Sequence, residues 1–284
     1  MAYTTVDDPS VYFQTKIYTG NGTDGTAISG VGFQPDWIWI KERSSTSDHG
    51  LYDAVRGANK HLEANKTTAE DSATNQLSSF DTDGFTLGDS GLTNEDDETY
   101  VAWNWKANGS GSANTAGSIN TTATSANTTS GFSIITYTGN GSSGATIGHG
   151  LSTAPQAVFI KKRTAANWTV GHVGVGWTKN GKLNTIDSFG VSALSFNNTA
   201  PSTSLITLGS GDVANADGGT YVCYAFSNIK GFSKMGSYTG NGNANGPFCF
   251  TGFKPAMVIF KDITGDRDWT MLDNKRNTFN VMDK

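Results

Sequence analysis

The sequence predicts an all-β protein made of tandem β-sandwich repeats. Three observations support this prediction. A turn motif returns three times, short apolar runs alternate with a period of two, and the 284 residues include 35 glycines but only 6 prolines. Alternating runs are typical of half-buried strands, and glycine-rich turns join the short strands of β-sandwiches. Repeats of about 100 residues are the size expected of such sandwiches.

The repeated turn is centred on Asn21, Asn140 and Asn241, each within the sequence Tyr-Thr-Gly-Asn-Gly. Asn-Gly between apolar runs favours a type I′ hairpin turn, because both residues tolerate a positive φ. The first copy also reads Gly-x-Gly-x-x-Gly, but a dinucleotide-binding loop needs a helix directly after it, and no helical period follows. The triplet therefore indicates internal repetition.

Two further landmarks recur. A proline is followed six residues later by a lysine in all three copies: Pro35/Lys41, Pro155/Lys161 and Pro255/Lys261. The closing stretch of the first copy, residues 87–105, matches residues 208–226 without a gap. The third copy stops before such a stretch. A repeat without its closing strand exposes a sheet edge, so a longer chain, another chain or another part of this one is expected to supply it.

These landmarks divide the chain into five segments. They are an N-terminal anchor segment (1–10), a first β-sandwich repeat (11–107), a flexible Gly/Ser/Thr/Asn linker (108–130), a second repeat (131–229) and the first half of an incomplete third repeat (230–284). The linker is predicted from composition alone.

Most elements are predicted to be strands. In the run Trp37-Ile38-Trp39-Ile40 both faces are apolar, which predicts a central strand covered on both sides. One face of each closing strand is apolar as well: Val101, Trp103 and Trp105 in the first copy, and Val222, Tyr224 and Phe226 in the second. Only residues 52–64 show a helical pattern, which Gly57 weakens.

Composition excludes several partners. Charged residues make up 16% of the chain and the net charge is −5, with no basic stripe, so no nucleic-acid partner is expected. No apolar run is long enough to insert in a membrane, and the polar N-terminus is not a signal peptide. The cysteines Cys223 and Cys249 lie in apolar runs and are interpreted as small buried residues rather than a disulfide.

No catalytic residues, metal ligands or cofactor are predicted. The stretch Asp81–Gly84 begins like a calcium loop but lacks the later ligands, and an Asp-Gly hairpin turn explains it more simply. The four histidines have no metal-ligand spacing, and no Gly-x-Ser-x-Gly elbow occurs. The pair Asp53/Arg56 recurs as Asp273/Arg276, which indicates a structural ion pair or turn rather than a ligand contact.

Two sets of residues are candidates for binding. Trp168, Trp177 and Trp269 lie near loops, where a tryptophan can stack on a sugar, although packing is the alternative use. Apolar residues of the N-terminal segment are expected to dock on another protein, with a frayed terminus as the alternative: Tyr3, Val6, Val11 and Tyr12.

With these motifs assembled, the chain resembles a repeat family common in marine tailed bacteriophages, notably cyanophages. The resemblance rests on the series YTGNG, GFQPDWIWIKER, LYDAVRG, FDTDGFTLG and TYVAWNWKA, and on the opening MAYTTVDDPSVYFQTKIYTGNG. It implies concanavalin-like or jelly-roll sandwiches in a virion structural or tail fibre protein without a catalytic set. The second copy departs from the pattern at the DAVRG segment.

The resemblance implies a non-enzymatic tail or head fibre, or a surface decoration, on the virion, made in the host cytoplasm. Its expected partners are other virion proteins and sister subunits in a homo-oligomer, with host-surface polysaccharide as a further ligand. The alternatives are a depolymerase that cuts host glycans and a secreted carbohydrate-binding protein. An acidic pair in a cleft would favour the enzyme.

Overall fold

A computed structural model of the chain describes residues 4–276, and the fold is all-β. The first sequence copy contains a 3₁₀ turn and one short helix among its strands. These elements are η1 (Pro9–Val11), β1 (Phe13–Thr19), β2 (Thr26–Ser29), β3 (Trp37–Glu42), β4 (Gly50–Asp53), β5 (Lys60–Glu63), β6 (Asp71–Ser72), β7 (Leu77–Asp81), β8 (Gly84–Leu87), α1 (Gly91–Asn94) and β9 (Thr99–Trp105).

The later part of the chain has similar elements, ending in a two-stranded hairpin. They are β10 (Ala123–Asn127), β11 (Phe132–Thr138), β12 (Thr146–Gly148), β13 (Ala157–Lys162), β14 (Trp168–His172), η2 (Val173–Val175), β15 (Lys179–Asn180), β16 (Gly190–Val191), α2 (Ala193–Phe196), β17 (Leu205–Thr207), α3 (Asp212–Asn215), β18 (Thr220–Phe226), β19 (Met257–Phe260) and β20 (Thr270–Asp273).

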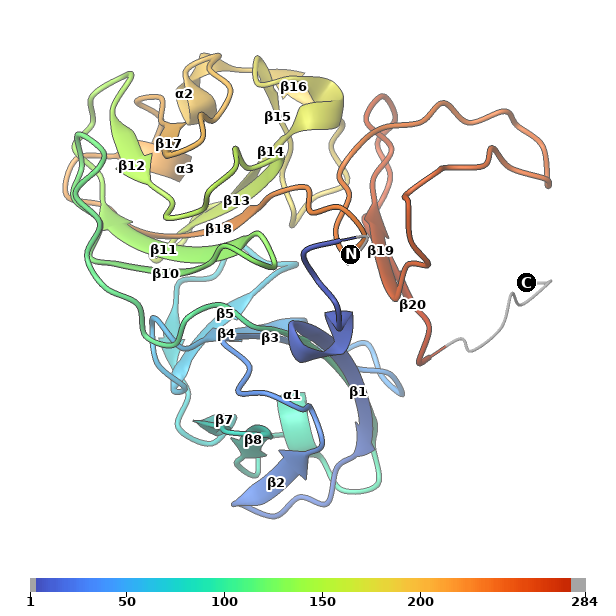
Figure 1. The fold of residues 1–284 in the computed structure, drawn as a ribbon. Helices are drawn as coiled ribbons and strands as arrows, with labels where there is room; N and C mark the ends of the chain where they lie inside the picture. Colours follow the sequence, from blue (N-terminus) through green and yellow to red (C-terminus); the bar gives the residue numbers. More distant parts are fainter. Residues whose placement is uncertain (1–3, 277–284) are drawn as a thin grey trace.

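Two large antiparallel sheets dominate the molecule (Figure 1). Their strand orders are β1-β9-β3-β4-β5-β6 and β10-β11-β18-β13-β14. The closing strands β9 and β18 are central in both, flanked by β1 and β3 or by β11 and β13. The registers also correspond: Trp105 lies opposite Phe13 and Trp37, and Phe226 lies opposite Phe132 and Ala157.

The two faces of each large sheet enter different cores. From β3, Trp37 and Trp39 enter a core that both copies share, while Ile38 and Ile40 face a core within the first copy. The small sheet β2-β8-β7 covers that second face, and the pair β12-β17 has the same position in the second copy. The prediction that residues 37–40 form a central strand covered on both sides is confirmed.

The Asn-Gly turns are not type I′ hairpins. The strands β1 and β2 belong to different sheets, and of the two turn residues in the first copy only Gly22 has a positive φ, at 62°. A buried asparagine holds the first two turns instead. The side-chain oxygen of Asn94 accepts from the Asn21 amide at 3.0 Å, and that of Asn215 accepts from the Asn140 amide at 2.9 Å. The motif therefore lies where the chain passes from the large sheet to the small one.

The segment predicted as a flexible linker is ordered. Its residues 123–127 form β10, which pairs with β11 along the edge of the second sheet. Ile119 and Ser125 are buried, and Ile119 bridges to Ile147. Composition suggested flexibility because serine and threonine side chains are polar, yet here Thr121 and Thr124 bond to each other at 2.9 Å inside the fold.

Other local expectations are corrected as well. Residues 52–64 contain β4, a turn and β5 rather than a helix, and Gly57 in the turn has φ of 100°. Cys223 is buried as predicted, whereas Cys249 is exposed, and both are free thiols.

The N-terminal segment packs against its own chain. Val6 is buried, and the ring of Tyr12 meets that of Phe232 edge-on, with centroids 6.1 Å apart. Val11 is half-buried, and Tyr3 lies outside the described residues. The apolar side chain of Val6 is therefore not free to dock on another protein.

Candidate functional site: the junction of the three copies

The three sequence copies meet in one apolar core. The ring of Trp37 stacks on that of Tyr224, with centroids 4.5 Å apart and an angle of 23°. The closing strands contribute Val101, Trp103 and Val222. From the third copy, Met257, Trp269 and Met271 pack against the same cluster. Burial of so many aromatic rings supplies the main apolar driving force at this junction.

A buried ion pair of the first copy is hydrogen-bonded to the second copy. The side chains of Asp53 and Arg56 are fully buried, and Arg56 donates to Asp53 from its Nε at 2.5 Å and its backbone amide at 2.8 Å. The hydroxyl of Tyr224, on β18, donates at 2.7 Å to Oδ2 of Asp53, the oxygen that also accepts from the Arg56 Nε. Burial raises the pKa of Tyr224 well above its ordinary value, so the hydroxyl keeps the proton that it donates.

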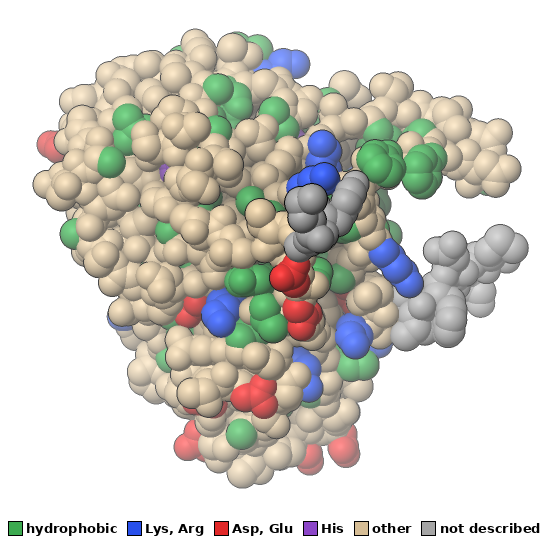
Figure 2. Space-filling view, in the orientation of Figure 1, with side chains coloured by type: hydrophobic (Ala, Val, Ile, Leu, Met, Phe, Trp, Pro, Cys, Tyr) green, Lys and Arg blue, Asp and Glu red, His purple; other side chains and the backbone are tan. Residues whose placement is uncertain are grey.

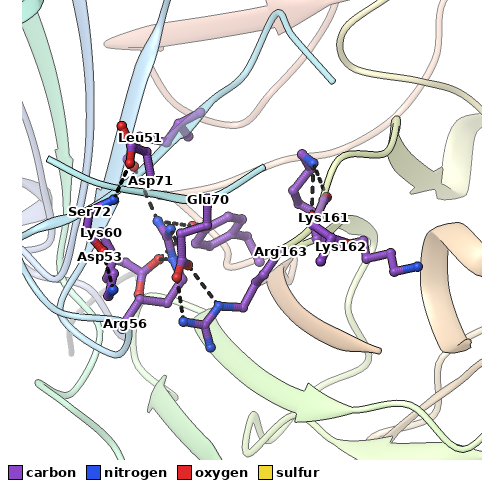
Figure 3. A network of polar contacts seen from close by, with 12 residues as sticks. Leu51, Asp53, Arg56, Lys60, Glu70, Asp71, Ser72, Lys161, Lys162 and Arg163 are labelled. Atoms are coloured by element: carbon purple, nitrogen blue, oxygen red, sulfur yellow. Dashed lines mark hydrogen bonds and ion pairs between the residues drawn. The ribbon is translucent and has the colours of Figure 1, made fainter. Parts of the chain in front are cut away.

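A second carboxylate extends this network (Figure 3). Glu70 lies between two arginines, with Arg56 at 3.1 Å and Arg163 of the second copy at 2.6 Å. Burial alone would raise the pKa of Glu70, but the hydrogen bond from Arg163 and the charge of Arg56 lower it below its ordinary value. The carboxylates of Asp53 and Glu70 are thus both paired with arginines, and the network joins the first copy to the second.

The third copy repeats this arrangement against the first. Arg276 donates to Asp273 from its Nε and from its backbone amide, the latter at 2.8 Å. The indole N–H of Trp103, on β9, donates to the Asp273 carboxylate at 3.2 Å. Trp103 and Tyr224 hold the same position in the two closing strands, so an aspartate in one copy bonds the closing strand of another.

A second pair of contacts runs between neighbouring copies. The indole N–H of Trp168 donates to the Glu63 carbonyl at 2.9 Å, and that of Trp269 donates to the Lys182 carbonyl at 2.9 Å. These contacts join the second copy to the first and the third to the second.

Two of the three landmark lysines make the same kind of contact. Lys161 reaches the Thr67 carbonyl at 3.5 Å, and Lys261 reaches the Ile186 carbonyl at 2.8 Å. Lys161 is buried and also donates to two carbonyls of its own copy, at Lys162 and Thr164. Together the contacts order the copies cyclically around the shared core.

One large cavity opens at this junction. Its volume is about 810 Å³, and residues of all three copies line it, including Trp39, Lys41, His49, Asn184 and Trp269. Arg276 closes one wall, where its guanidinium lies 4.8 Å from the centre of the Trp103 ring. Small-molecule binding sites of proteins are commonly concave sites of this size.

Two titratable groups of the cavity, His49 and Lys41, are already engaged in hydrogen bonds. His49 accepts from the Trp39 indole at its Nδ1, at 2.9 Å. Burial and the charge of Lys41 lower the pKa of His49 to about 4, so the ring is neutral at pH 7 and its lone pair is used. Lys41 donates to the carbonyls of Glu42 and Ser45 at 2.6 and 2.9 Å. These groups position the cavity wall rather than offering a free general base.

The three tryptophans predicted to stack on a glycan differ in their exposure. Trp168 is fully buried and Trp177 is 9% exposed, so neither presents a ring face to a sugar. Trp177 packs edge-on against Phe196, with centroids 5.3 Å apart. Trp269 is half-buried and lines the cavity. Sequence reasoning found the Asp/Arg pair but missed Glu70 and Arg163, because no landmark links these two positions.

The acidic stretch at residues 81–84 forms a hairpin turn between β7 and β8, as the Asp-Gly pattern predicts. Asp83 accepts from the backbone amides of Gly30 and Gly32 at 3.0 and 2.6 Å. Asp81 accepts from Ser79 and Thr86. Within residues 4–276, no three or more His, Cys, Asp or Glu side chains are grouped to hold a metal ion.

The fold and the junction define an all-β protein whose recurring polar side chains join neighbouring copies. Among the described residues, no helix has the length and apolar character needed to cross a membrane. The chain belongs to the family described as a domain of unknown function, DUF7483, whose model matches residues 8–284. That one match spans all three copies and the residues between them. No curated protein and no solved structure matches the chain.

Removing one charge of the buried network should destabilise the protein. Asp53→Asn leaves Arg56 with only Glu70 as a counter-charge, so we expect the free energy of unfolding to fall by about 3 kcal/mol. Asp89→Asn, the same change at an exposed position, should alter it by less than about 0.5 kcal/mol. Urea denaturation measures both, and equal effects would show that the ion pair is not structural.

The stability due to Lys161 should depend on pH. Burial lowers its pKa to about 8 from the ordinary 10.5, so between these values the unfolded chain binds more protons at this residue than the folded chain. The free energy of unfolding contributed by Lys161 therefore rises with pH across that window, with a slope of at most about 1.4 kcal/mol per pH unit.

Denaturation at pH 7.5, 8.5 and 9.5 tests this. The free energy of unfolding of the native protein minus that of Lys161→Met should increase as the pH rises. The difference for Lys179→Met, at an exposed lysine, should stay constant. If the native value minus the Lys161→Met value decreased with pH, the lowered pKa of Lys161 would be contradicted.

Proposed function

We propose that the protein is a non-enzymatic structural component of a bacteriophage particle, a tail or head fibre or a surface decoration. It is built from tandem β-sandwich repeats of the jelly-roll or concanavalin-like kind. The observation that carries the structural role is that polar residues recurring between copies bond one copy to another. The resemblance of the sequence motifs to marine tailed-phage proteins supports the virion assignment.

The recurring residues have a structural use at each place. Asp53 and Asp273 bond closing strands of other copies, and Lys161 and Lys261 bond backbone carbonyls of neighbouring copies. A catalytic set would instead leave an acid, base or nucleophile free to reach substrate. Recurrence is therefore explained by assembly of the copies, which favours a structural protein over an enzyme.

The acidic residues of the cavity also favour a non-enzymatic protein. Glycoside hydrolysis requires two carboxyl groups on opposite sides of the scissile bond. Two acidic residues occur among the described residues that line the cavity, Glu42 and Asp268. Glu42 is buried and accepts from the Ser47 hydroxyl, whereas Asp268 is exposed. One free carboxylate supports ligand binding better than hydrolysis.

Host-surface glycan is the proposed ligand of the cavity. The half-buried ring of Trp269 offers an apolar face, and Thr185, Asp268 and the exposed Arg43 provide polar groups around it. Sugars are bound by this combination of an aromatic face and surrounding hydrogen-bonding groups. A binding role of this kind suits a particle component that meets the host surface.

The particle assignment is tested by locating the chain. Immunogold labelling and mass spectrometry of purified particles should find it in the virion, and the purified protein should leave host polysaccharide at its original length. The chain's absence from particles would contradict the virion role. Shortening of polysaccharide that Asp268→Asn abolishes would favour the depolymerase.

Glycan binding is tested separately by titration calorimetry with host polysaccharide fragments. Trp269→Ala should weaken binding about tenfold or more, which corresponds to 1.4 kcal/mol. Phe248→Ala removes a highly exposed ring outside the cavity and should leave the affinity unchanged. Equal affinities of the two variants would show that the cavity is not the glycan site.

A further inference from the structure

The Asn-Gly turns of the first two copies carry a sequence that can react with itself. In the turns at residues 21–22 and 140–141, an asparagine precedes a glycine, and glycine has no side chain to shield its backbone nitrogen. Asn21 and Asn140 are both exposed, so water and solvent base reach them. Whether the sequence reacts therefore depends on how each turn is bonded.

The reaction is succinimide formation. The glycine nitrogen loses its proton to solvent base and attacks the side-chain carbonyl carbon of the asparagine. A nitrogen–carbon bond forms, the bond from that carbon to the side-chain nitrogen breaks, and ammonia leaves. Water then opens the cyclic imide at either carbonyl, which leaves aspartate or isoaspartate in place of asparagine. The first step needs a glycine N–H that is free to lose its proton.

In both turns that N–H is already bonded. The Gly22 amide donates to the backbone carbonyl of Asn94 at 2.8 Å. The Gly141 amide donates in the same way to the backbone carbonyl of Asn215 at 2.9 Å. Both acceptor residues are fully buried. An amide held in this way reacts only when the turn opens locally, so the reaction rate follows the population of the open turn.

The side chains of the buried asparagines keep these carbonyls in place. Asn94 accepts from the Asn21 amide at 3.0 Å, and it donates to the carbonyls of Thr23 and Gly88 at 3.0 and 2.8 Å. Asn215 makes three matching bonds, at 2.9, 2.9 and 3.0 Å, with the Asn140 amide and the carbonyls of Ser142 and Gly209. The same residue thus holds the turn and occupies the nucleophile.

The side chain of the reacting asparagine is held as well. The Asn21 side-chain oxygen accepts from the Thr23 amide at 3.0 Å and from the Thr26 hydroxyl at 2.7 Å. The Asn140 oxygen accepts from the Ser142 amide at 3.0 Å. These bonds are made to the oxygen and leave the carbonyl carbon open to attack. The bond that blocks the nucleophile is the one from the glycine amide.

We propose that Asn21 and Asn140 are latent sites of succinimide formation, and that Asn94 and Asn215 keep them unreacted. Each buried asparagine then has a chemical role besides its structural one. The sites become reactive only where the turn opens, as it does in an unfolded or damaged chain. The assignment rests on hydrogen bonds within the first two copies and does not depend on the virion role.

Reaction at Asn21 would damage the turn in two ways. Isoaspartate inserts a further carbon atom into the backbone where the chain passes between two sheets. Figure 2 shows acidic side chains at the lower end of the molecule, where Figure 1 places β2 and α1. Asp24 is exposed just after the turn, and the exposed Asp96 lies beside Gly22. A new carboxylate at position 21 would add a charge of the same sign there.

Peptide-mapping mass spectrometry of protein kept at mildly alkaline pH measures conversion at each asparagine. The synthetic peptide YTGNGTDG, the sequence of residues 18–25, gives the rate of an unprotected pair. Asn21 in the native protein should react about tenfold or more slowly than in this peptide, because only the open turn reacts. This comparison needs no variant, so it holds whether or not the variants fold.

Two variants test the buried asparagines, and each turn is the control for the other. Asn94→Ala should speed conversion of Asn21 about tenfold or more and leave Asn140 within about twofold. Asn215→Ala should do the reverse. Thr26→Val removes a bond to the Asn21 side chain but leaves the glycine amide bonded, so Asn21 should stay within about twofold of its native rate. Hydrogen exchange of the Gly22 amide should rise with conversion in each variant.

Four results would overturn the proposal. Native Asn21 that reacts as fast as the peptide would show that the bonded amide gives no protection. Asn94→Ala that leaves the rate at Asn21 unchanged would show that another restraint protects it. Equal acceleration of Asn21 and Asn140 in that variant would indicate loosening of the whole fold. Acceleration by Thr26→Val as large as by Asn94→Ala would assign the protection to the Asn21 side chain instead.

Discussion

The structure depends on an aspartate of one copy that accepts a hydrogen bond from the closing strand of another. Asp53 is held by Arg56 from its own turn and by Tyr224 from the second copy, and Asp273 is held in the same way by Arg276 and Trp103. An isolated carboxylate in this apolar junction would be costly, because burial removes its hydration. The arginine three residues later compensates the charge, and the carboxylate oxygen that accepts from its Nε also accepts from the closing strand of the other copy. The shared aromatic core can therefore pack around a polar contact that fixes which copies are neighbours.

This constraint explains why the copies do not behave as separate sandwiches. Each large sheet has one face covered by its own small sheet and the other face covered by a neighbouring copy. A single copy taken alone would expose Trp37, Trp39 and Trp103 together, a patch too large and too apolar for a soluble surface. The buried lysine at position 161 follows from the same geometry, since it sits where three carbonyls from two copies converge. The junction is thus both the core and the site where the cavity forms.

Much of the fold could be predicted from local pattern, and the rest depends on contacts between distant residues. The two-faced apolar run at residues 37–40, the hairpin at residues 81–84 and the buried face of the closing strands follow from periodicity and turn chemistry. The burial of Trp168 could not be predicted in this way, because its indole N–H bonds the carbonyl of Glu63, a residue of another copy. The network through Glu70 and Arg163 was equally hidden, since Glu70 does not recur and lies 93 residues from Arg163 in the sequence. Cys249 is exposed although its run is apolar, and the matching residue of the first copy, Ser29 at the end of β2, is exposed as well.

The opening strands show how one side chain decides whether a sheet edge needs cover. In the first copy β1 reads FQTKIYT and forms an outer edge, where Lys16 extends toward the Gly30 carbonyl and keeps the edge polar. In the second copy β11 reads FSIITYT, with no charge, and β10 from the supposed linker covers it. The polar composition of residues 108–130 was therefore misleading in a specific way. Thr124 and Ser125 are buried on opposite faces of β10, and both hydroxyls are hydrogen-bonded, that of Thr124 to Thr121 and that of Ser125 to the Asn108 amide. The third opening segment has Gly236 at the place of Lys16, and residues 234–240 form no strand, as the low strand propensity of glycine favours.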